Sequence, residues 1–350
     1  MTISVDGSPV EIDVVDPRLT LLEVLRGPCA ISSVKDGCSP QGQCGCCTVL
    51  VDGQPRVACV TPVRRIAGRR VTTLDGLDPG TSARWLSAFT ACGASQCGFC
   101  TPGIILRLEG LRSRSTTSST PATVGGGPDG PAAPAAPLPG EDAVERALAA
   151  HLCRCTGWRP IIEAWHLATA DDRAAADHGS DGRSADQQAA RRLADGGMAG
   201  RDRVAAEARA RLEGGVPQQV GLEVAAGQAG FAADTVPADA LVALPTPGGV
   251  GGDGADAGDP GSWVVAGTLA EARRRSAKVQ GRRTTADGEP PLDAPPGAWA
   301  VTLRTAWVDP AYLETDASWC EPGGTPASPL ANGGAFGGKT STPVGSVARR

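Results

Sequence analysis

The chain has 350 residues, of which 41% are hydrophobic and 20% charged, and its formal net charge of −5 gives no reason to expect nucleic-acid binding. Its 47 glycines and 29 prolines indicate two or three modules joined by irregular segments rather than one large domain. The N-terminus lacks a basic segment followed by an apolar run, and no stretch of 18 apolar residues occurs. We therefore expect a cytoplasmic protein without a membrane span.

The first 76 residues have the pattern of a small α+β domain. Apolar and polar residues alternate over 3–14 around Asp6-Gly7, which predicts a β-hairpin. Residues 19–26 have the spacing of a helix, and residues 48–60 predict a second hairpin that turns at Asp52-Gly53. A cysteine-rich loop lies between this helix and the second hairpin.

Four cysteines in and after this loop have the order of a plant-type ferredoxin: Cys38, Cys44, Cys47 and Cys59. Four thiolates are the ligand set of a [2Fe–2S] cluster, although the first gap here is one residue longer than usual. The alternative is zinc, but zinc sites usually combine two close cysteine couples. Because Cys44-x₂-Cys47 keeps the usual spacing, we predict that the adjacent Cys46 is not a ligand.

Residues 82–170 are predicted to be helical. Helical segments are expected over 82–94, 102–112, 143–152 and 160–168, and Pro102 and Pro160 are suited to helix starts. The stretch 113–141 is rich in Pro, Gly, Ala, Ser and Thr, which predicts a flexible loop. The four helices would thus form a bundle with a long loop between the second and the third.

A second group of four cysteines borders these helices: Cys97, Cys100, Cys153 and Cys155. A thioredoxin-like couple would need only one of the two pairs, and the Cys-x-Cys spacing is tight for zinc. Helices that begin just after each pair would direct positive helix N-termini at an anionic cluster. The group therefore favours a second [2Fe–2S] site, and two such sites in one chain indicate electron transfer.

The stretches LLEVLR, KDGCSPQGQCGCCTVLVDG, GASQCGFCTPGI and LCRCTGW resemble the iron–sulfur module of the molybdenum hydroxylases, the xanthine dehydrogenase and aldehyde oxidase family. This resemblance covers roughly residues 3–168. It implies a β-grasp plant-type ferredoxin domain over 1–76, a four-helix domain over 82–170, and one [2Fe–2S] cluster in each. It also implies that the second cysteine group lies nearer the molybdenum. The chain departs from the family in carrying Ala150-His151 where Gly-Asn is common before LCRC.

The remaining sequence is less regular. Residues 171–215 are Ala-rich without an apolar stripe and are predicted to be a linker, and short apolar runs over 216–350 predict a β-rich region. GGAFGGKT at 333–340 fits a P-loop through Lys339 and Thr340, but no strand precedes it. The same letters resemble a segment of the family's molybdenum domain, which implies an incomplete α+β molybdopterin-binding region. The residues implied to contact the cofactor are Phe336, Gly337 and Gly338.

Together these patterns predict the electron-transfer component of a molybdenum-dependent hydroxylase, with no catalytic residue of its own. The resemblance implies a molybdenum-binding catalytic subunit as partner, and an FAD subunit or another acceptor for the electrons. We expect the chain to be an iron–sulfur subunit fused to the start of a catalytic subunit, or a truncated product. The alternatives are a free-standing ferredoxin-like carrier with a non-functional tail and a zinc-stapled binding module.

Overall fold

The computed structural model describes residues 1–14, 16–38, 40–117, 138–172, 208, 221–246, 262–276, 294–303, 313–327, 333–335 and 342–350. Nearly all of the predicted linker 171–215 and most of the predicted loop 113–141 lie outside the described residues. So do the predicted cofactor contacts at 336–338 and the P-loop residues Lys339 and Thr340. In the described part of the chain, no helix is long and apolar enough to cross a membrane.

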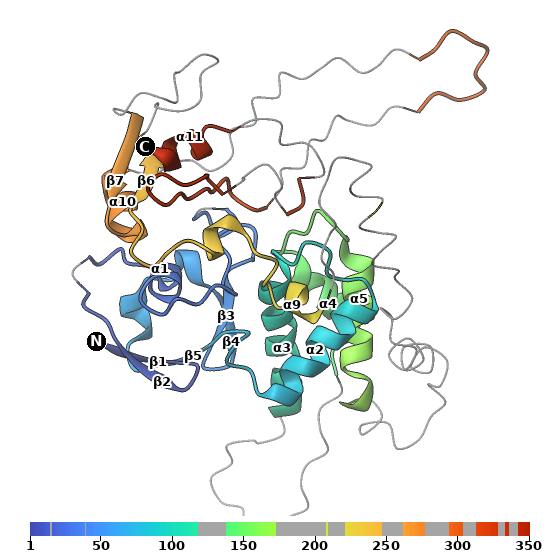
Figure 1. Cartoon of the computed structure of the whole chain (residues 1–350). Coiled ribbons are helices and arrows are strands. Elements are labelled where there is room, and N and C mark those ends of the chain that lie inside the picture. The colour runs from blue at the N-terminus through green and yellow to red at the C-terminus, as the bar shows by residue number, and fades with distance from the viewer. Residues whose placement is uncertain are drawn as a thin grey trace, which may run out of the picture.

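A five-stranded mixed sheet is formed by the N-terminal residues, in the order β2-β1-β5-β3-β4 (Figure 1). Both predicted hairpins are confirmed, the first made by β1 (Thr2–Val5) and β2 (Ser8–Glu11), the second by β3 (Thr48–Val51) and β4 (Gln54–Val57). The strand β5 (Arg70–Thr72) runs parallel to β1 and antiparallel to β3, so it joins the hairpins into one sheet. Three residues are too few to show strand alternation, and β5 was not predicted.

The helix α1 (Leu21–Arg26) begins at a capping box. The hydroxyl of Thr20 accepts from the Glu23 amide, and the Glu23 carboxylate accepts from the Thr20 amide. Four of its six residues are buried apolar side chains. Two 3₁₀ turns, η1 (Ala58–Val60) and η2 (Val63–Ile66), follow β4, and Cys59 lies in η1. The sheet and these turns therefore bring Cys59 back to the loop after α1.

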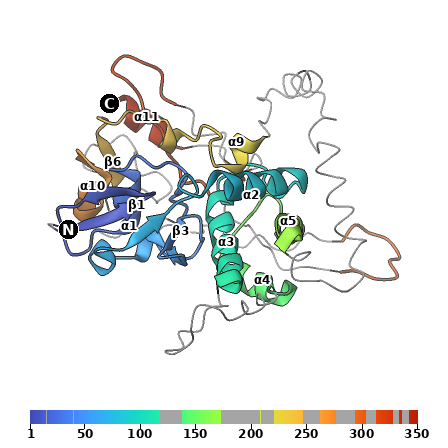
Figure 2. The same ribbon diagram turned by 90° about the horizontal axis from the view of Figure 1, so that it is seen from below.

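Four helices follow the sheet, as predicted: α2 (Pro79–Ala91), α3 (Thr101–Thr117), α4 (Glu141–Leu148) and α5 (Trp158–Ala168). The helix α2 begins three residues earlier than predicted because the Asp78 carboxylate accepts from the Thr81 amide at 3.0 Å and caps it. The helix α3 packs against β3, and α2 packs against α5 (Figure 2). A Cβ atom on Gly110 of α3 would collide with Pro55, so this glycine lets helix and sheet approach closely.

One continuous apolar core connects the sheet with the helices. Trp85 of α2 lies at its centre, with its ring centroid 6.3 Å from that of Phe89 and 6.0 Å from that of Trp165. The buried Trp85 indole donates to the Glu109 carboxylate at 2.8 Å, so its polar nitrogen is satisfied. The same core includes three residues from beyond position 220, namely Ala225, Phe231 and Leu313.

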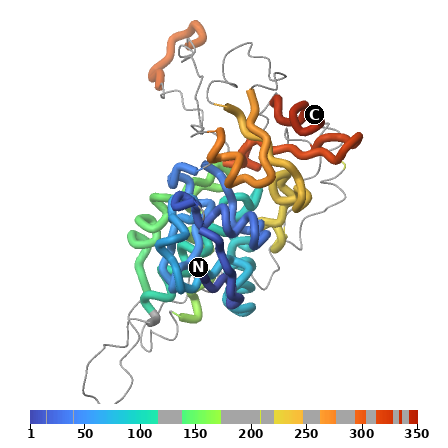
Figure 3. The backbone as a smooth tube through the Cα atoms, turned by 90° about the vertical axis from the view of Figure 1, so that its left-hand side faces the viewer, coloured from blue at the N-terminus to red at the C-terminus, as the bar shows by residue number. Residues whose placement is uncertain are grey.

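The described C-terminal elements are α9 (Leu222–Ala225), η3 (Ala232–Asp234), β6 (Val242–Pro245), β7 (Trp263–Ala266), α10 (Leu269–Ser276) and α11 (Val344–Arg349). The antiparallel pair of β6 and β7 confirms two of the predicted apolar strands. The prediction was wrong at 220–224, where α9 buries Val224 and Ala225, because a five-residue apolar run has no decisive period. Residues 299–303 also form no strand and are exposed. The strands β6 and β7 and the helices α10 and α11 lie at one end of the described N-terminal part (Figure 3), while α9 packs against α2.

Candidate metal centres

The first set of thiols lies where the loop after α1 meets η1. The Cys38 thiol is within hydrogen-bonding reach of the Cys44 and Cys59 thiols, and Cys59 is also within reach of Cys47. All four side chains are buried. Backbone amides point at the sulfurs, since Gln41 donates to Cys38 at 3.3 Å and Cys59 donates to Cys47 at 3.4 Å. The four residues predicted from spacing are therefore brought together in one contiguous group.

Two glycines allow the loop to wrap this closely. A Cβ atom on Gly37 would lie 3.0 Å from the Cys44 sulfur. Gly45 has a φ of +74° and its missing Cβ would collide with the ring of His151. Any larger residue at these positions would push the loop away from the thiols or from the helical region.

Cys46 is fully buried beside the first set. Its thiol lies within reach of the Cys44 thiol and donates to the Cys44 carbonyl at 3.8 Å. Burial alone is the usual state of a free cysteine, which behaves as a small apolar residue. That Cys46 is not a ligand remains a prediction.

The second set of thiols forms two contacting pairs. The sulfurs of Cys97 and Cys155 are 3.4 Å apart, and the Cys100 thiol is within hydrogen-bonding reach of Cys153. Cys100 immediately precedes α3, and Cys153 and Cys155 lie just before α5. Two helix N-termini thus begin beside these thiols, as the sequence predicted, and their positive ends favour an anionic group.

The thiols of each set shift one another's pKa values through direct contact. Contact with Cys100 lowers the pKa of Cys153 to about 5, and the same contact, reinforced by burial, raises the pKa of Cys100. In the first set, contacts with Cys44 and Cys59 lower the pKa of Cys38, while the pKa values of those two partners rise. Four thiolates are the donor set of a [2Fe–2S] cluster, and its iron ions would supply positive charge beside them.

The chain segments that carry the two sets are hydrogen-bonded to each other. The Leu152 amide, next to Cys153, donates to the Cys44 carbonyl at 3.0 Å. Beside this bond, the buried His151 ring shares a 3.1 Å hydrogen bond with the Thr48 hydroxyl. Burial and the nearby Arg107 guanidinium lower the pKa of His151 to about 4, so it is neutral at neutral pH. From the sequence, His151 was noted only as a departure from the family pattern. That departure was the one signal in the sequence that pointed to a special role for this residue.

C-terminal residues cover the second set, which sequence reasoning did not foresee. The Arg154 guanidinium donates to the carbonyls of Gly334 and Ala335 at 2.7 and 3.0 Å. A Cβ on Gly333 would lie 3.1 Å from the Cys97 sulfur. A small cavity of about 10 Å³ remains there, lined by Cys97, Cys100, Arg154, Cys155, Leu313, Gly333 and Gly334.

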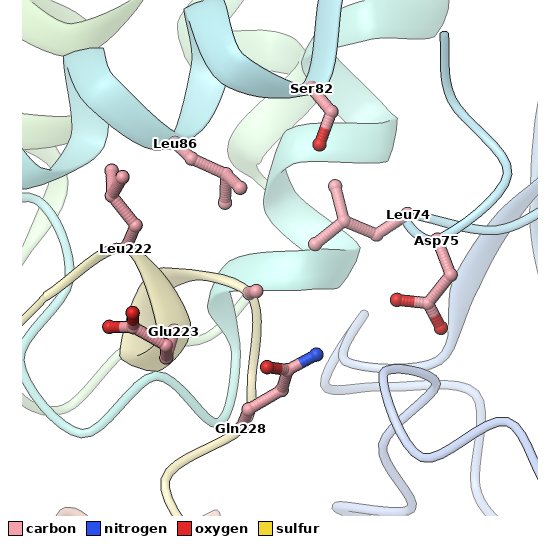
Figure 4. A pocket seen from close by; sticks show the side chains of 8 residues that line it. Leu74, Asp75, Ser82, Leu86, Leu222, Glu223 and Gln228 are labelled. Atoms are coloured by element: carbon pink, nitrogen blue, oxygen red, sulfur yellow. The ribbon is translucent and has the colours of Figure 1, made fainter. Parts of the chain in front are cut away.

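A larger hollow of about 290 Å³ lies between α2, α9 and the loop after β5 (Figure 4). Its lining residues are Leu74, Asp75, Ser82, Leu86, Leu222, Glu223, Ala226 and Gln228. None of the eight predicted ligands faces it, so it is separate from the thiol sets.

The two halves of this arrangement match two known families. Residues 3–65 match the 2Fe-2S iron-sulfur cluster binding domain, and residues 73–166 match the [2Fe-2S] binding domain. The chain is 32% identical over 156 residues to the nicotinate dehydrogenase small FeS subunit of Eubacterium barkeri, which covers 44% of this chain and 85% of that subunit. The chain belongs to the iron–sulfur family of xanthine dehydrogenase and aldehyde oxidase type.

Other members of this family are much longer. The xanthine dehydrogenase of Emericella nidulans is 36% identical over 170 residues, which are 45% of this chain and 11% of that enzyme. The crystal structure of the aldehyde oxidoreductase from Desulfovibrio desulfuricans is similar with a TM-score of 0.48 and 27% identity, over 71% of this chain and 24% of that one. This chain therefore spans only a small part of the large enzymes that it matches.

Membership of the family confirms the electron-transfer iron–sulfur role predicted from the sequence. It also confirms two [2Fe–2S] domains of mixed α+β content and favours iron–sulfur clusters over zinc. The alternative of a free-standing carrier is not favoured, because the relative with the fullest coverage described above is named as a subunit.

Proposed function

We propose that the chain is the electron-transfer component of a molybdenum-dependent hydroxylase and carries electrons from a molybdenum-binding catalytic subunit to FAD or another acceptor. The observation that carries this proposal is the pair of thiol sets, each with four cysteines, joined by the hydrogen bond from Leu152 to Cys44. The names of the relatives support a multi-subunit or multi-domain enzyme as the setting.

The proposed ligands of the first cluster are Cys38, Cys44, Cys47 and Cys59, and those of the second are Cys97, Cys100, Cys153 and Cys155. A bound [2Fe–2S] cluster would supply one-electron redox chemistry in each set. The chain itself buries all four cysteines of the first set and Cys100 of the second, which keeps water away from them, while Cys97, Cys153 and Cys155 are half-buried. It stabilises thiolates through the amides of Gln41 and Cys59 and through the N-termini of α3 and α5.

We place the side that faces the molybdenum at the second set. Residues 333–335 lie against Cys97 and are held by Arg154, and they directly precede the proposed molybdopterin contacts Phe336, Gly337 and Gly338. The Glu314 carboxylate accepts from the Gly333 amide and fixes this segment from the other side. The cofactor would thus be shared between this chain and a catalytic partner, with the first set on the side of the electron acceptor.

Anaerobic reconstitution of the purified chain with iron and sulfide tests the proposal. We expect about four iron and about four acid-labile sulfide per chain, because eight thiolates serve two clusters. Reduction by dithionite should give two distinguishable EPR signals, while aldehydes and purines should reduce neither cluster without the catalytic partner. A protein that retains zinc and takes up no iron would contradict the proposal.

A further inference from the structure

Lys35 is a fully buried cation in the loop that leads to Cys38. Its backbone amide donates to the Cys46 carbonyl at 3.4 Å, so its position is tied to the loop of the first thiol set. A buried ammonium group is costly unless it is paired and hydrogen-bonded. The partners of Lys35 therefore indicate which part of the molecule has been built around this charge.

Two polar partners of the Lys35 ammonium, a backbone carbonyl and a carboxylate, come from residues 227–234. The Lys35 ammonium donates to the Gly227 carbonyl at 2.6 Å and forms an ion pair with the Asp234 carboxylate. It also lies 5.0 Å from the centre of the Phe231 ring. Arg26 of α1 donates to Asp234 at 2.9 Å, so the carboxylate is shared by two cations.

This charged group lies one layer of side chains from both thiol sets. Phe231 packs edge-on against Phe99, which stands between Cys97 and Cys100, with ring centroids 5.2 Å apart. Phe99 also lies close to the first set. A Cβ atom on Gly37 would be 3.2 Å from the Phe99 ring and 3.0 Å from the Cys44 sulfur, so Gly37 lies against both. The intervening groups are apolar and buried, so charges act across them at a lower dielectric constant than in water.

We infer that the buried pair of Lys35 and Asp234 tunes the reduction potentials of the two clusters, with the ammonium favouring the reduced state and the carboxylate opposing it. The reason is that reduction adds one negative charge to a cluster, which a nearby cation stabilises. A unit charge on the order of 10 Å away, at an effective dielectric constant of about 20, changes an equilibrium constant by roughly tenfold. Lys35 and Asp234 thus act on the clusters through their charges and not as ligands. The inference rests on the cluster occupancy proposed above.

The two charges make predictions of opposite sign. Lys35→Met removes the cation and should lower the potential of at least one cluster by the equivalent of roughly tenfold in its reduction equilibrium, about 59 mV for a one-electron couple. Asp234→Asn removes the negative charge and should raise the potential when it is measured at a pH low enough to keep Lys35 protonated, because burial lowers the pKa of Lys35 and Asp234 opposes that shift. The double variant removes both charges and should return the potential toward that of the wild type. A purely structural role would not reverse sign between the two single variants.

The experiment is a redox titration of the reconstituted full-length chain, followed by EPR so that the two clusters are resolved. Arg159→Met serves as a matched control, because Arg159 lies near Cys155 in the sequence but its side chain is 80% exposed and screened by solvent. Urea denaturation of the same variants gives the coupling energy of the pair from a double-mutant cycle, independently of the clusters. If Lys35→Met does not fold, Asp234→Asn and the double variant still test the direction in which the reduction potential shifts.

Opposite shifts in the single variants, with little shift in the control, would establish the inference. Shifts of the same sign, or no shift while iron content is intact, would overturn it and leave the proposed function standing. A wild-type chain that binds no clusters at all would overturn the proposed function and this inference with it.

Discussion

At the scale of single residues, the cysteines of the first loop differ in their contacts, although four of them lie within the ten residues 38–47. Cys44 and Cys47 keep the spacing that places two sulfurs on one cluster, and Cys47 also contacts Cys59 from the distant turn η1. Cys46 is equally buried, so burial does not distinguish a ligand from its neighbour. Substituting each cysteine in turn distinguishes a cluster ligand from a buried cysteine that is not a ligand.

We expect Cys47→Ser to remove or alter the first cluster only, because a hydroxyl is a poor substitute for a thiolate ligand of iron. Cys46→Ser should leave both clusters intact. Iron analysis and the EPR spectrum of the reduced protein measure both outcomes. Loss of a cluster in Cys46→Ser with none in Cys47→Ser would show that the ligand assignment is wrong.

His151 should make stability depend on pH. Its pKa is about 4 in the folded chain and about 6.5 when unfolded, so between these values the unfolded chain binds more protons. Its contribution is complete above pH 6.5 and is lost as the pH falls toward 4. Between pH 7 and pH 5 this lowers the free energy of unfolding by about 2 kcal/mol. Urea denaturation at both pH values should show a smaller pH dependence for His151→Asn, and an equal dependence would contradict the assignment.

At the scale of elements, caps and close approaches fix where the helices start and stop. The helix α4 ends at Leu148 because the chain must turn there, with the His151 amide donating to the Leu148 carbonyl at 2.7 Å and Leu152 reaching Cys44. The sequence predicted that this helix ends four residues later, at Leu152, since Ala149 to Leu152 continue its apolar pattern. The tertiary contact with the first loop outweighs the local preference for helix.

The N-cap of α2 offers a direct test at this scale. Asp78→Ala removes the acceptor for the Thr81 amide and should lower the free energy of unfolding. Asp78→Asn keeps an acceptor at the same place and should cost much less. Urea denaturation of the two variants measures the difference. Equal losses in both variants would show that the charge near the helix N-terminus, rather than the cap, is what matters.

At the scale of the whole molecule, the C-terminal residues form one structure with the cysteine-bearing part. Phe231 and Leu313 belong to the continuous core, and Arg273 pairs with Glu23 of the N-terminal part at 3.6 Å. The Val224 carbonyl lies against Gly98, between two of the second-set cysteines. These contacts explain why the second thiol set is only partly exposed.

Phe231→Ala should therefore loosen the cover of the second cluster. The substitution removes the edge-on contact with Phe99 and the packing against Gly333, a loss of about 3 kcal/mol for a buried aromatic ring. An iron chelator should then take iron from the second cluster faster than from the first, as followed by EPR over time. Val236→Ala, at a side chain that is 42% exposed, serves as the control and should change neither rate. Equal acceleration at both clusters would contradict a local effect.

The sequence by itself determined both hairpins, the helix α1 and the four helices α2 to α5, and it predicted the eight proposed ligands. These features follow from local rules, because thiol spacing, hydrophobic period and turn residues such as Asp52-Gly53 are readable within a few positions of each other. The iron–sulfur family was predictable for the same reason, and the comparisons confirm it.

Only the tertiary structure decided how these parts meet. It placed β5 between the hairpins, joined Leu152 to Cys44, and set Lys35 against Asp234, which is 199 residues away in the chain. Such contacts depend on which surfaces become buried together, and no local period or spacing encodes a partner at that distance. A lysine next to a cysteine loop resembles any surface cation until the fold shows that it is buried and paired.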